Sequence, residues 1–110
     1  MLELWQTEWC PSSRRVRERL TELGVDCVIR QVPVEKELRD ELRAVTGSDS
    51  IPAAVCMDGR VVVGEEAIVA ALEARFPEPP GAEAHRSRAA KARRRFLEEE
   101  CECLQQPVTR

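Results

Sequence analysis

Residues 9–15 read Trp-Cys-Pro-Ser-Ser-Arg-Arg, and an amphipathic helical pattern follows directly. Pro11 suits the first position of a helix, where its missing N–H costs no hydrogen bond. Cys10 then precedes the helix, and the unpaired N–H groups and the positive end of the helix dipole point at its sulfur. We therefore predict that the pKa of Cys10 lies below the ordinary thiol value of about 8.5, with Arg14 and Arg15 adding positive charge nearby.

A cysteine prepared in this way is a candidate nucleophile. The alternative is that Cys10 is only a helix cap, but cysteine caps helices less well than serine, threonine or aspartate. Ser13 falls in the first helical turn and could donate a hydrogen bond to a Cys10 thiolate. A solvated serine without a function is an equally good interpretation of that position.

The composition limits the classes of function. A chain of 110 residues with 43% hydrophobic residues can bury a single core. It has no apolar run near the ~20 residues that span a bilayer, and its first five residues lack the pattern of a secretory signal. The net charge of −3 is too small to imply a polyanionic partner, and the basic run at 86–95 has no interleaved aromatic residues. We expect a cytoplasmic protein that binds neither membrane nor nucleic acid.

The five cysteines show no Cys-x-x-Cys motif and no paired cysteine–histidine spacing. This pattern argues against a disulfide framework and against a structural metal site. Cys27 and Cys56 fall in apolar strand patterns, where we expect inert core thiols. Cys101 and Cys103 are two positions apart in a helical pattern, so their side chains should diverge.

The apolar periodicity predicts strands at 2–5, 25–32, 53–57 and 60–63, and helices at 11–23, 35–45 and 65–76. Asp58-Gly59 indicates a hairpin between the last two strands. We expect Leu38, Leu42 and Val45 to form the buried stripe of the second helix. A right-handed crossover makes the first two strands parallel. The fold class is therefore α/β, a four-stranded mixed sheet in β-α-β-α-β-β-α order with helices on both faces.

Ligands of such sheets bind beyond the carboxyl ends of parallel strands, which is where Cys10 lies. The Pro- and Gly-rich segment after residue 77 predicts a domain at 1–77, a linker at 78–81 and a helical extension at 82–110. The extension reads as one helix to residue 106 with a frayed end. Its basic first half and acidic second half oppose the helix dipole, so it should need a packing partner, such as a second copy in a homodimer.

Three motifs together resemble a glutaredoxin and, equally, the thioredoxin-fold N-terminal domain of a glutathione transferase. They are Trp-Cys-Pro at 9–11, Ile-Pro-Ala at 51–53 and Gly-Glu-Glu-Ala-Ile at 64–68, and the likeness covers residues 2–77. The resemblance implies that Cys10 attacks a mixed disulfide, with glutathione or another low-molecular-weight thiol as co-substrate. It also implies that Pro52 is cis beside the thiol and that the backbone of Ile51 pairs with the cysteinyl part of glutathione.

The same resemblance assigns the γ-glutamyl end of glutathione to Gly64, Glu65 and Glu66. Trp9 and Pro11, which flank the thiol, complete the expected glutathione contacts. Ser13 stands where dithiol glutaredoxins carry their second cysteine, so the predicted activity is that of a monothiol thiol–disulfide oxidoreductase acting on a small-thiol or protein mixed disulfide. We expect no metal site.

The sequence also departs from these families in ways that leave other functions open. Thr7 stands where glutaredoxins tend to have a lysine, and Glu8 beside it would repel a glutathione carboxylate. Glu65 stands where transferases have a serine. The alternatives are an iron–sulfur cluster carrier and a non-catalytic binding module. Conjugation of electrophiles is expected least, because the segment after residue 81 is short for a second helical domain.

Overall fold

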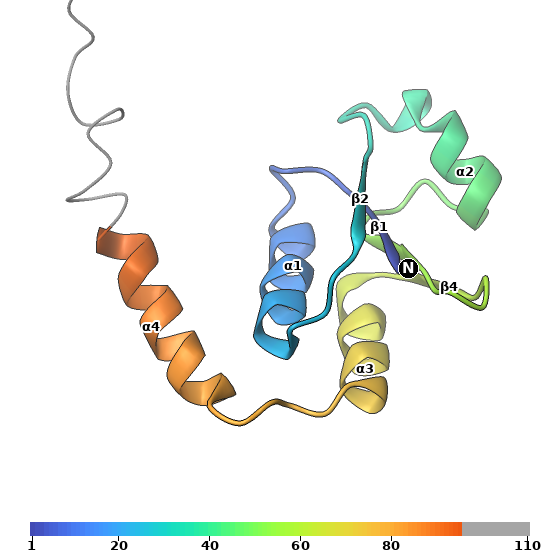
Figure 1. The fold of residues 1–110 in the computed structure, drawn as a ribbon. Helices are drawn as coiled ribbons and strands as arrows, with labels where there is room; N and C mark the ends of the chain where they lie inside the picture. Colours follow the sequence, from blue (N-terminus) through green and yellow to red (C-terminus); the bar gives the residue numbers. More distant parts are fainter. Residues whose placement is uncertain (96–110) are drawn as a thin grey trace, which may run out of the picture. The chain divides into compact units, whose positions relative to one another are not determined.

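The chain divides into two compact units, Met1–Pro79 and Pro80–Arg110, and the computed structural model describes residues 1–95. The element order (Figure 1) is β1 (Glu3–Gln6), α1 (Pro11–Leu23), β2 (Val28–Gln31), a 3₁₀ turn η1 (Lys36–Leu38), α2 (Asp40–Thr46), β3 (Ala53–Val55), β4 (Val61–Val63), α3 (Glu65–Arg75) and α4 (Ala82–Arg95). This order confirms the predicted β-α-β-α-β-β-α arrangement. The second half of the predicted C-terminal helix, with Cys101 and Cys103, lies outside the described residues.

The sheet has the strand order β2-β1-β3-β4. β1 is parallel to β2 and antiparallel to β3, and β3 and β4 form the predicted hairpin. In the register of β1 with β3, Leu4 lies opposite Ala54 and Trp5 opposite Ala53. Because successive strand residues point to opposite faces, Leu4 and Ala54 serve one core, and Trp5 and Ala53 serve the other.

Helices cover both faces of this sheet, as predicted (Figure 1). α1 and α3 pack on the Leu4 face through Val16, Leu20, Leu23, Ile68 and Leu72. α2 packs on the Trp5 face, where Leu42 and Val32 complete the smaller core. The first of these contacts fixes α1 against β1, so that Cys10 lies at the carboxyl end of β1.

The prediction of one helix over 35–45 is wrong. The chain forms η1, leaves helical geometry at Arg39 (φ −89°, ψ 45°) and starts again as α2. The Arg39 side chain turns inward to bind backbone carbonyls of the segment before η1 and of the loop after α2, which holds the break in place. The break also disrupts the predicted stripe. Leu42 is buried, but Leu38 and Val45 are 60% and 42% exposed.

Two strands are shorter than predicted. β2 starts at Val28, because the N–H of Val25 is taken by the C=O of Leu20 at the end of α1 (2.9 Å). β3 ends at Val55, because the C=O of Cys56 accepts the Gly59 N–H in the hairpin turn (2.9 Å). Cys27 and Cys56 are consequently half-buried at the margin of the core, and not within it as predicted.

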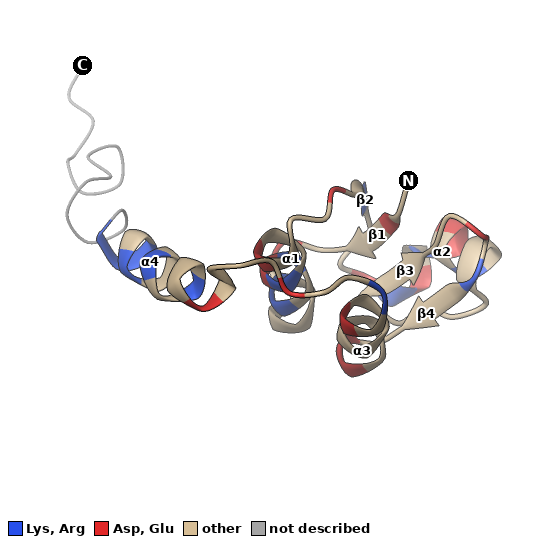
Figure 2. Ribbon diagram, turned by 60° about the horizontal axis from the view of Figure 1, so that its bottom comes forward, with Lys and Arg blue, Asp and Glu red and all other residues tan. Residues whose placement is uncertain are grey.

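In the second unit, α4 contains six Lys or Arg side chains and one acidic residue, Glu83. Figure 2 shows this basic character along the helix. Its described part agrees with the start of the predicted helix at residue 82. No helix within residues 1–95 is long and apolar enough to cross a membrane.

Candidate functional site

Cys10 caps the N-terminus of α1. Its backbone is extended (φ −74°, ψ 118°), Pro11 takes the first helical position, and the Ser13 N–H donates to Cys10 Sγ at 3.4 Å. The Cys10 C=O accepts the first helical hydrogen bond, from Arg14 (3.0 Å). The thiol is half-buried and therefore remains accessible to a reactant.

These surroundings favour the thiolate. Partial burial opposes ionisation, but the Ser13 side chain, the N–H groups of Ser13 and Ser12, and the charge of Arg39 together hold the pKa of the Cys10 thiol below its ordinary value. This direction agrees with the prediction. The Ser13 oxygen is fully buried and completes no other hydrogen bond with any of residues 1–95, so the hydroxyl is available to the sulfur.

The source of positive charge near Cys10 differs in part from the one we predicted. Arg14 pairs with Glu18 at 3.0 Å, and Arg15 pairs with Glu65 at 2.8 Å, so both predicted cations are engaged by carboxylates. Arg15 still interacts with the charge of Cys10, and Arg39, from the break between η1 and α2, faces the thiol as a further cation. No sequence motif marks Arg39. The rule that ligands bind at the carboxyl ends of strands could have pointed to it, because its segment follows β2.

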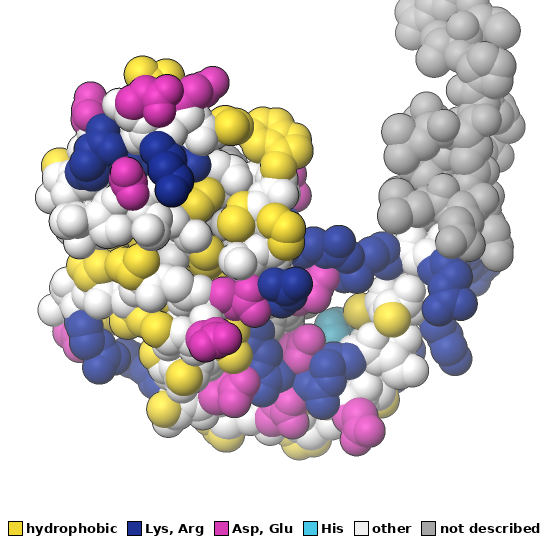
Figure 3. Space-filling view, turned by 180° about the vertical axis from the view of Figure 1, so that it is seen from behind, with side chains coloured by type: hydrophobic (Ala, Val, Ile, Leu, Met, Phe, Trp, Pro, Cys, Tyr) yellow, Lys and Arg dark blue, Asp and Glu magenta, His cyan; other side chains and the backbone are white. Residues whose placement is uncertain are grey.

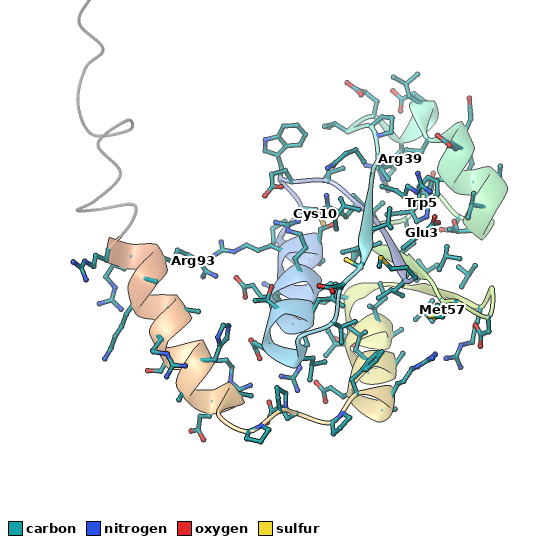
Figure 4. The ribbon with its side chains drawn as sticks, in the orientation of Figure 1. Glu3, Trp5, Cys10, Arg39, Met57 and Arg93 are labelled. Carbon is teal, nitrogen blue, oxygen red and sulfur yellow. The ribbon has the colours of Figure 1, made fainter. Side chains whose placement is uncertain are left out.

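A hollow of about 410 Å³ opens beside the sulfur, and we call it the thiol hollow. It is lined by Thr7, Trp9, Cys10, Val34, Lys36, Arg39, Ser50 and Ile51. Figure 4 shows Cys10 and Arg39 at the same end of the sheet. The hollow brings together three predicted site residues, Cys10, Trp9 and Ile51, and Trp9 stands at its rim with 77% of its surface exposed.

Ile51 presents an unused backbone to this hollow. The Ile51-Pro52 peptide bond is cis, as the resemblance implied. Among the described residues, neither the N–H nor the C=O of Ile51 forms a hydrogen bond, whereas the Pro52 C=O accepts from Gly64 (2.9 Å). Pro52 itself is buried, and neither Pro52 nor Pro11 lines the hollow.

Arg39 is 7% exposed and donates to three backbone carbonyls. Nε reaches Pro33 (2.8 Å), Nη1 reaches Asp49 (2.8 Å) and Nη2 reaches Val34 (2.9 Å). A guanidinium has five N–H groups, so two remain. No Asp or Glu in residues 1–95 forms an ion pair with Arg39. The hollow is thus lined by a buried positive charge that carbonyl dipoles solvate and that no carboxylate of residues 1–95 balances.

A second hollow of about 570 Å³, the α3 hollow, lies at the start of α3. It is lined by Ser12, Arg15, Val63, Gly64, Glu65, Glu66 and Ala67, so the residues expected at the γ-glutamyl end do lie together. Gly64 has φ 99°, a backbone conformation that favours glycine. The hydrogen bond from Arg15 is the main cause that lowers the pKa of Glu65.

The acidic surroundings predicted for the thiol are only partly present. Glu8 is held by Arg17 (3.0 Å) and does not line the thiol hollow, so the predicted repulsion of a carboxylate by Glu8 is not supported. The charged residues that line this hollow, Lys36 and Arg39, are both cations. Acidic side chains gather instead in the α3 hollow.

The other described cysteines lack these features. Cys56 lies in a third hollow, of about 380 Å³, with mostly apolar walls that include Met57 and Phe76. Figure 4 shows Met57 at the β3–β4 hairpin, away from Cys10. Burial, and then the charge of Asp26, raise the pKa of the Cys27 thiol. In residues 1–95 no three His, Cys, Asp or Glu side chains are grouped so that they could hold a metal ion.

Comparisons with known proteins show which protein family and which solved structures the chain is similar to. The family model described as "Glutathione S-transferase, N-terminal domain" matches residues 4–80. A search of curated proteins gives no significant match. A glutathione S-transferase from Rhodospirillum rubrum F11 superposes with a TM-score of 0.62 at 26% identity, covering 94% of this chain and 47% of that one.

Two further solved structures share the fold. Human glutathione S-transferase T1-1, in its apo form, has a TM-score of 0.64 at 22% identity, covering 72% of this chain and 34% of that one. A transferase from Methylobacillus flagellatus with glutathione bound has a TM-score of 0.61 at 23% identity, covering 70% and 38%. The chain therefore spans less than half the length of each of these structures.

Proposed function

Since the chain belongs to the glutathione S-transferase N-terminal domain family, we propose that it binds glutathione, or a related low-molecular-weight thiol, in the thiol hollow and uses Cys10 as a nucleophile on mixed disulfides. The observation that carries this proposal is the position of Cys10. Its sulfur sits at a helix N-terminus that favours the thiolate and borders a hollow with an unused peptide group and two cations. The glutathione bound to the Methylobacillus flagellatus transferase supports a ligand of this type.

The thiol hollow suits the cysteinyl-glycine part of glutathione. The free N–H and C=O of Ile51 would pair with the backbone of the cysteinyl residue, as in the addition of an extended strand. Lys36 and Arg39 would receive the glycine carboxylate, and charge-assisted hydrogen bonds to such a group are the strong ones. In this pose the glutathione sulfur points toward Cys10.

The α3 hollow would hold the γ-glutamyl end, which carries both an ammonium and a carboxylate. The exposed Glu66 side chain is a partner for the ammonium. The N–H groups at the start of α3 attract the carboxylate. Because Glu65 is already engaged by Arg15, its charge opposes that carboxylate less than the sequence alone suggested.

The reaction consists of two thiol–disulfide exchanges. In the first, the Cys10 thiolate attacks the glutathionyl sulfur of R–S–S–G, a Cys10–glutathione disulfide forms, the original S–S bond breaks, and the leaving RS⁻ takes up a proton. In the second, the thiolate of a free glutathione attacks the same sulfur and releases Cys10. The balance is one mixed disulfide and one glutathione converted to RSH and glutathione disulfide. Ser13 is not a thiol, so the second reductant comes from outside this helix.

Binding can be tested apart from chemistry with S-methylglutathione, which cannot form a disulfide. We expect its addition to ¹⁵N-labelled protein to shift the backbone amide resonances of Ile51 and Ser13 in a saturable manner. The amide of Arg60, at the third hollow, is the internal control and should not move. Shifts confined to the third hollow, or no shifts at all, would contradict glutathione binding at Cys10.

A further inference from the structure

We propose that Arg39 is a positioning residue for the chemistry of Cys10, because its buried guanidinium joins the two walls of the thiol hollow and so sets the place of Ile51 opposite the sulfur. This role for Arg39 deepens the proposed function and rests on it for its biological meaning. Its structural basis is independent of the identity of the thiol ligand.

The first step is the geometry of the walls. One wall is the segment after β2, which lines the hollow at Val34, and the other is the loop before β3, which lines it at Ser50 and Ile51. Arg39 Nε and Nη2 bind the first wall, and Nη1 binds the second. The donors of a guanidinium lie in one rigid plane, so contacts to both walls at once fix the spacing between them.

The second step is the connection to Ile51. The loop before β3 is internally tied, since the Thr46 hydroxyl binds the C=O of Leu42 (2.9 Å) and of Ser48 (2.9 Å), and the Ser50 N–H binds Ser48 Oγ (3.0 Å). These bonds hold the loop to α2 on one side only. The bond from Arg39 to the Asp49 carbonyl ties it to the β2 side, two residues before Ile51 (Figure 4 shows the position of Arg39).

The third step is charge. A buried cation is normally paired with an anion, because removing it from water is costly. No carboxylate of the described chain pairs with Arg39, so the anions that can balance it are the Cys10 thiolate and a ligand carboxylate. The other cations around the sulfur are Lys36, in the same hollow, and Arg15, which Glu65 engages. The lowered pKa of Cys10 agrees with this arrangement.

Two substitutions separate the effect of Arg39 on the spacing of the walls from the effect of its charge on Cys10. Arg39→Lys keeps a positive charge but loses the planar fork that reaches three carbonyls, and Arg39→Met loses both. Arg43→Met is the matched control. Arg43 also binds carbonyls, those of Lys36 (2.8 Å) and Glu37 (3.2 Å), and pairs with Asp40 (2.6 Å), but it does not line the hollow. Its further pair with the Asp49 carboxylate is long (3.8 Å) and exposed, so its loss should have little effect on the loop. Acidic and basic side chains lie interspersed over the surface of α2 (Figure 3).

The experiment measures the pH profile of Cys10 alkylation by iodoacetamide and the rate of adduct formation with oxidised glutathione. For Arg39→Met we expect the alkylation profile to move to higher pH and adduct formation to slow by about tenfold or more. Arg39→Lys should keep the wild-type alkylation profile but form the adduct about tenfold more slowly. Arg43→Met should match the wild type in both measurements.

Arg39 variants that behave as Arg43→Met does would overturn the inference. Circular dichroism identifies a variant that does not fold, and if Arg39→Met fails in this way, Arg39→Lys decides alone: a wild-type rate of adduct formation would count against positioning. The proposed function fails separately, by the absence of a glutathione adduct on the wild-type protein. The alkylation profile still tests the charge of Arg39 in that case.

Discussion

Cys10→Ser is expected to lower the rate of mixed-disulfide reduction by roughly 10³-fold or more, the scale on which loss of an enzyme's nucleophile acts. A serine hydroxyl does not ionise near neutral pH and cannot form the disulfide that links the two exchanges. Serine is also a better N-cap than cysteine, so α1 should keep its structure. The measurement is the formation of glutathione disulfide from glutathione and the mixed disulfide of glutathione and 2-mercaptoethanol, followed as NADPH oxidation by added glutathione reductase.

Cys56→Ser is the matched control for this experiment. Cys56 is also a half-buried thiol, but it lies in the hairpin turn and lines the third hollow. Its replacement should leave the rate unchanged within about twofold, because a distant surface substitution seldom exceeds about 0.5 kcal/mol. Retained activity in Cys10→Ser, or a loss of activity in Cys56→Ser, would remove Cys10 from the mechanism.

The second large effect concerns stability. Leu42→Ala should lower the free energy of unfolding by about 2–5 kcal/mol, the range found when a buried leucine is truncated. Leu42 is 1% exposed and is the only buried residue of α2. It packs in the core cluster that contains Trp5, Val32 and Ala53. Urea denaturation followed by circular dichroism measures the loss.

Val45→Ala provides the comparison on the same helix. Val45 is 42% exposed, so its truncation should cost less than about 1 kcal/mol. The sequence periodicity had placed both side chains in one buried stripe. Equal losses for the two variants would favour that stripe and contradict the orientation of α2 described here.

The contrast between α1 and α2 shows what the sequence could predict. The bounds of α1 follow from local signals, Pro11 at its start and Gly24 in the left-handed conformation at its end. α2 has no comparable start signal. Its first residue is set by Arg39, whose contacts reach Pro33 and Asp49, and no local pattern encodes such contacts.

The candidate site likewise contains residues that the sequence could predict and residues that it could not. Cys10 and Ile51 were recognisable because each belongs to a short motif. Arg39 and Lys36 were missed, since single basic residues in an amphipathic segment are typical of an exposed helix face. The pairing of Arg15 with Glu65 could not be predicted from the sequence either, because the two residues are 50 positions apart. This pair changes the charge available to a ligand in the α3 hollow.

The central claim is that Cys10 is the nucleophile of a hollow that accepts glutathione. Its most direct test is mass spectrometry of peptides from the full chain after incubation with oxidised glutathione. All five cysteines compete under the same conditions. We predict a single glutathione adduct on Cys10, absent from Cys10→Ser. No adduct, or an adduct on Cys27 or Cys56 in preference to Cys10, would contradict the claim.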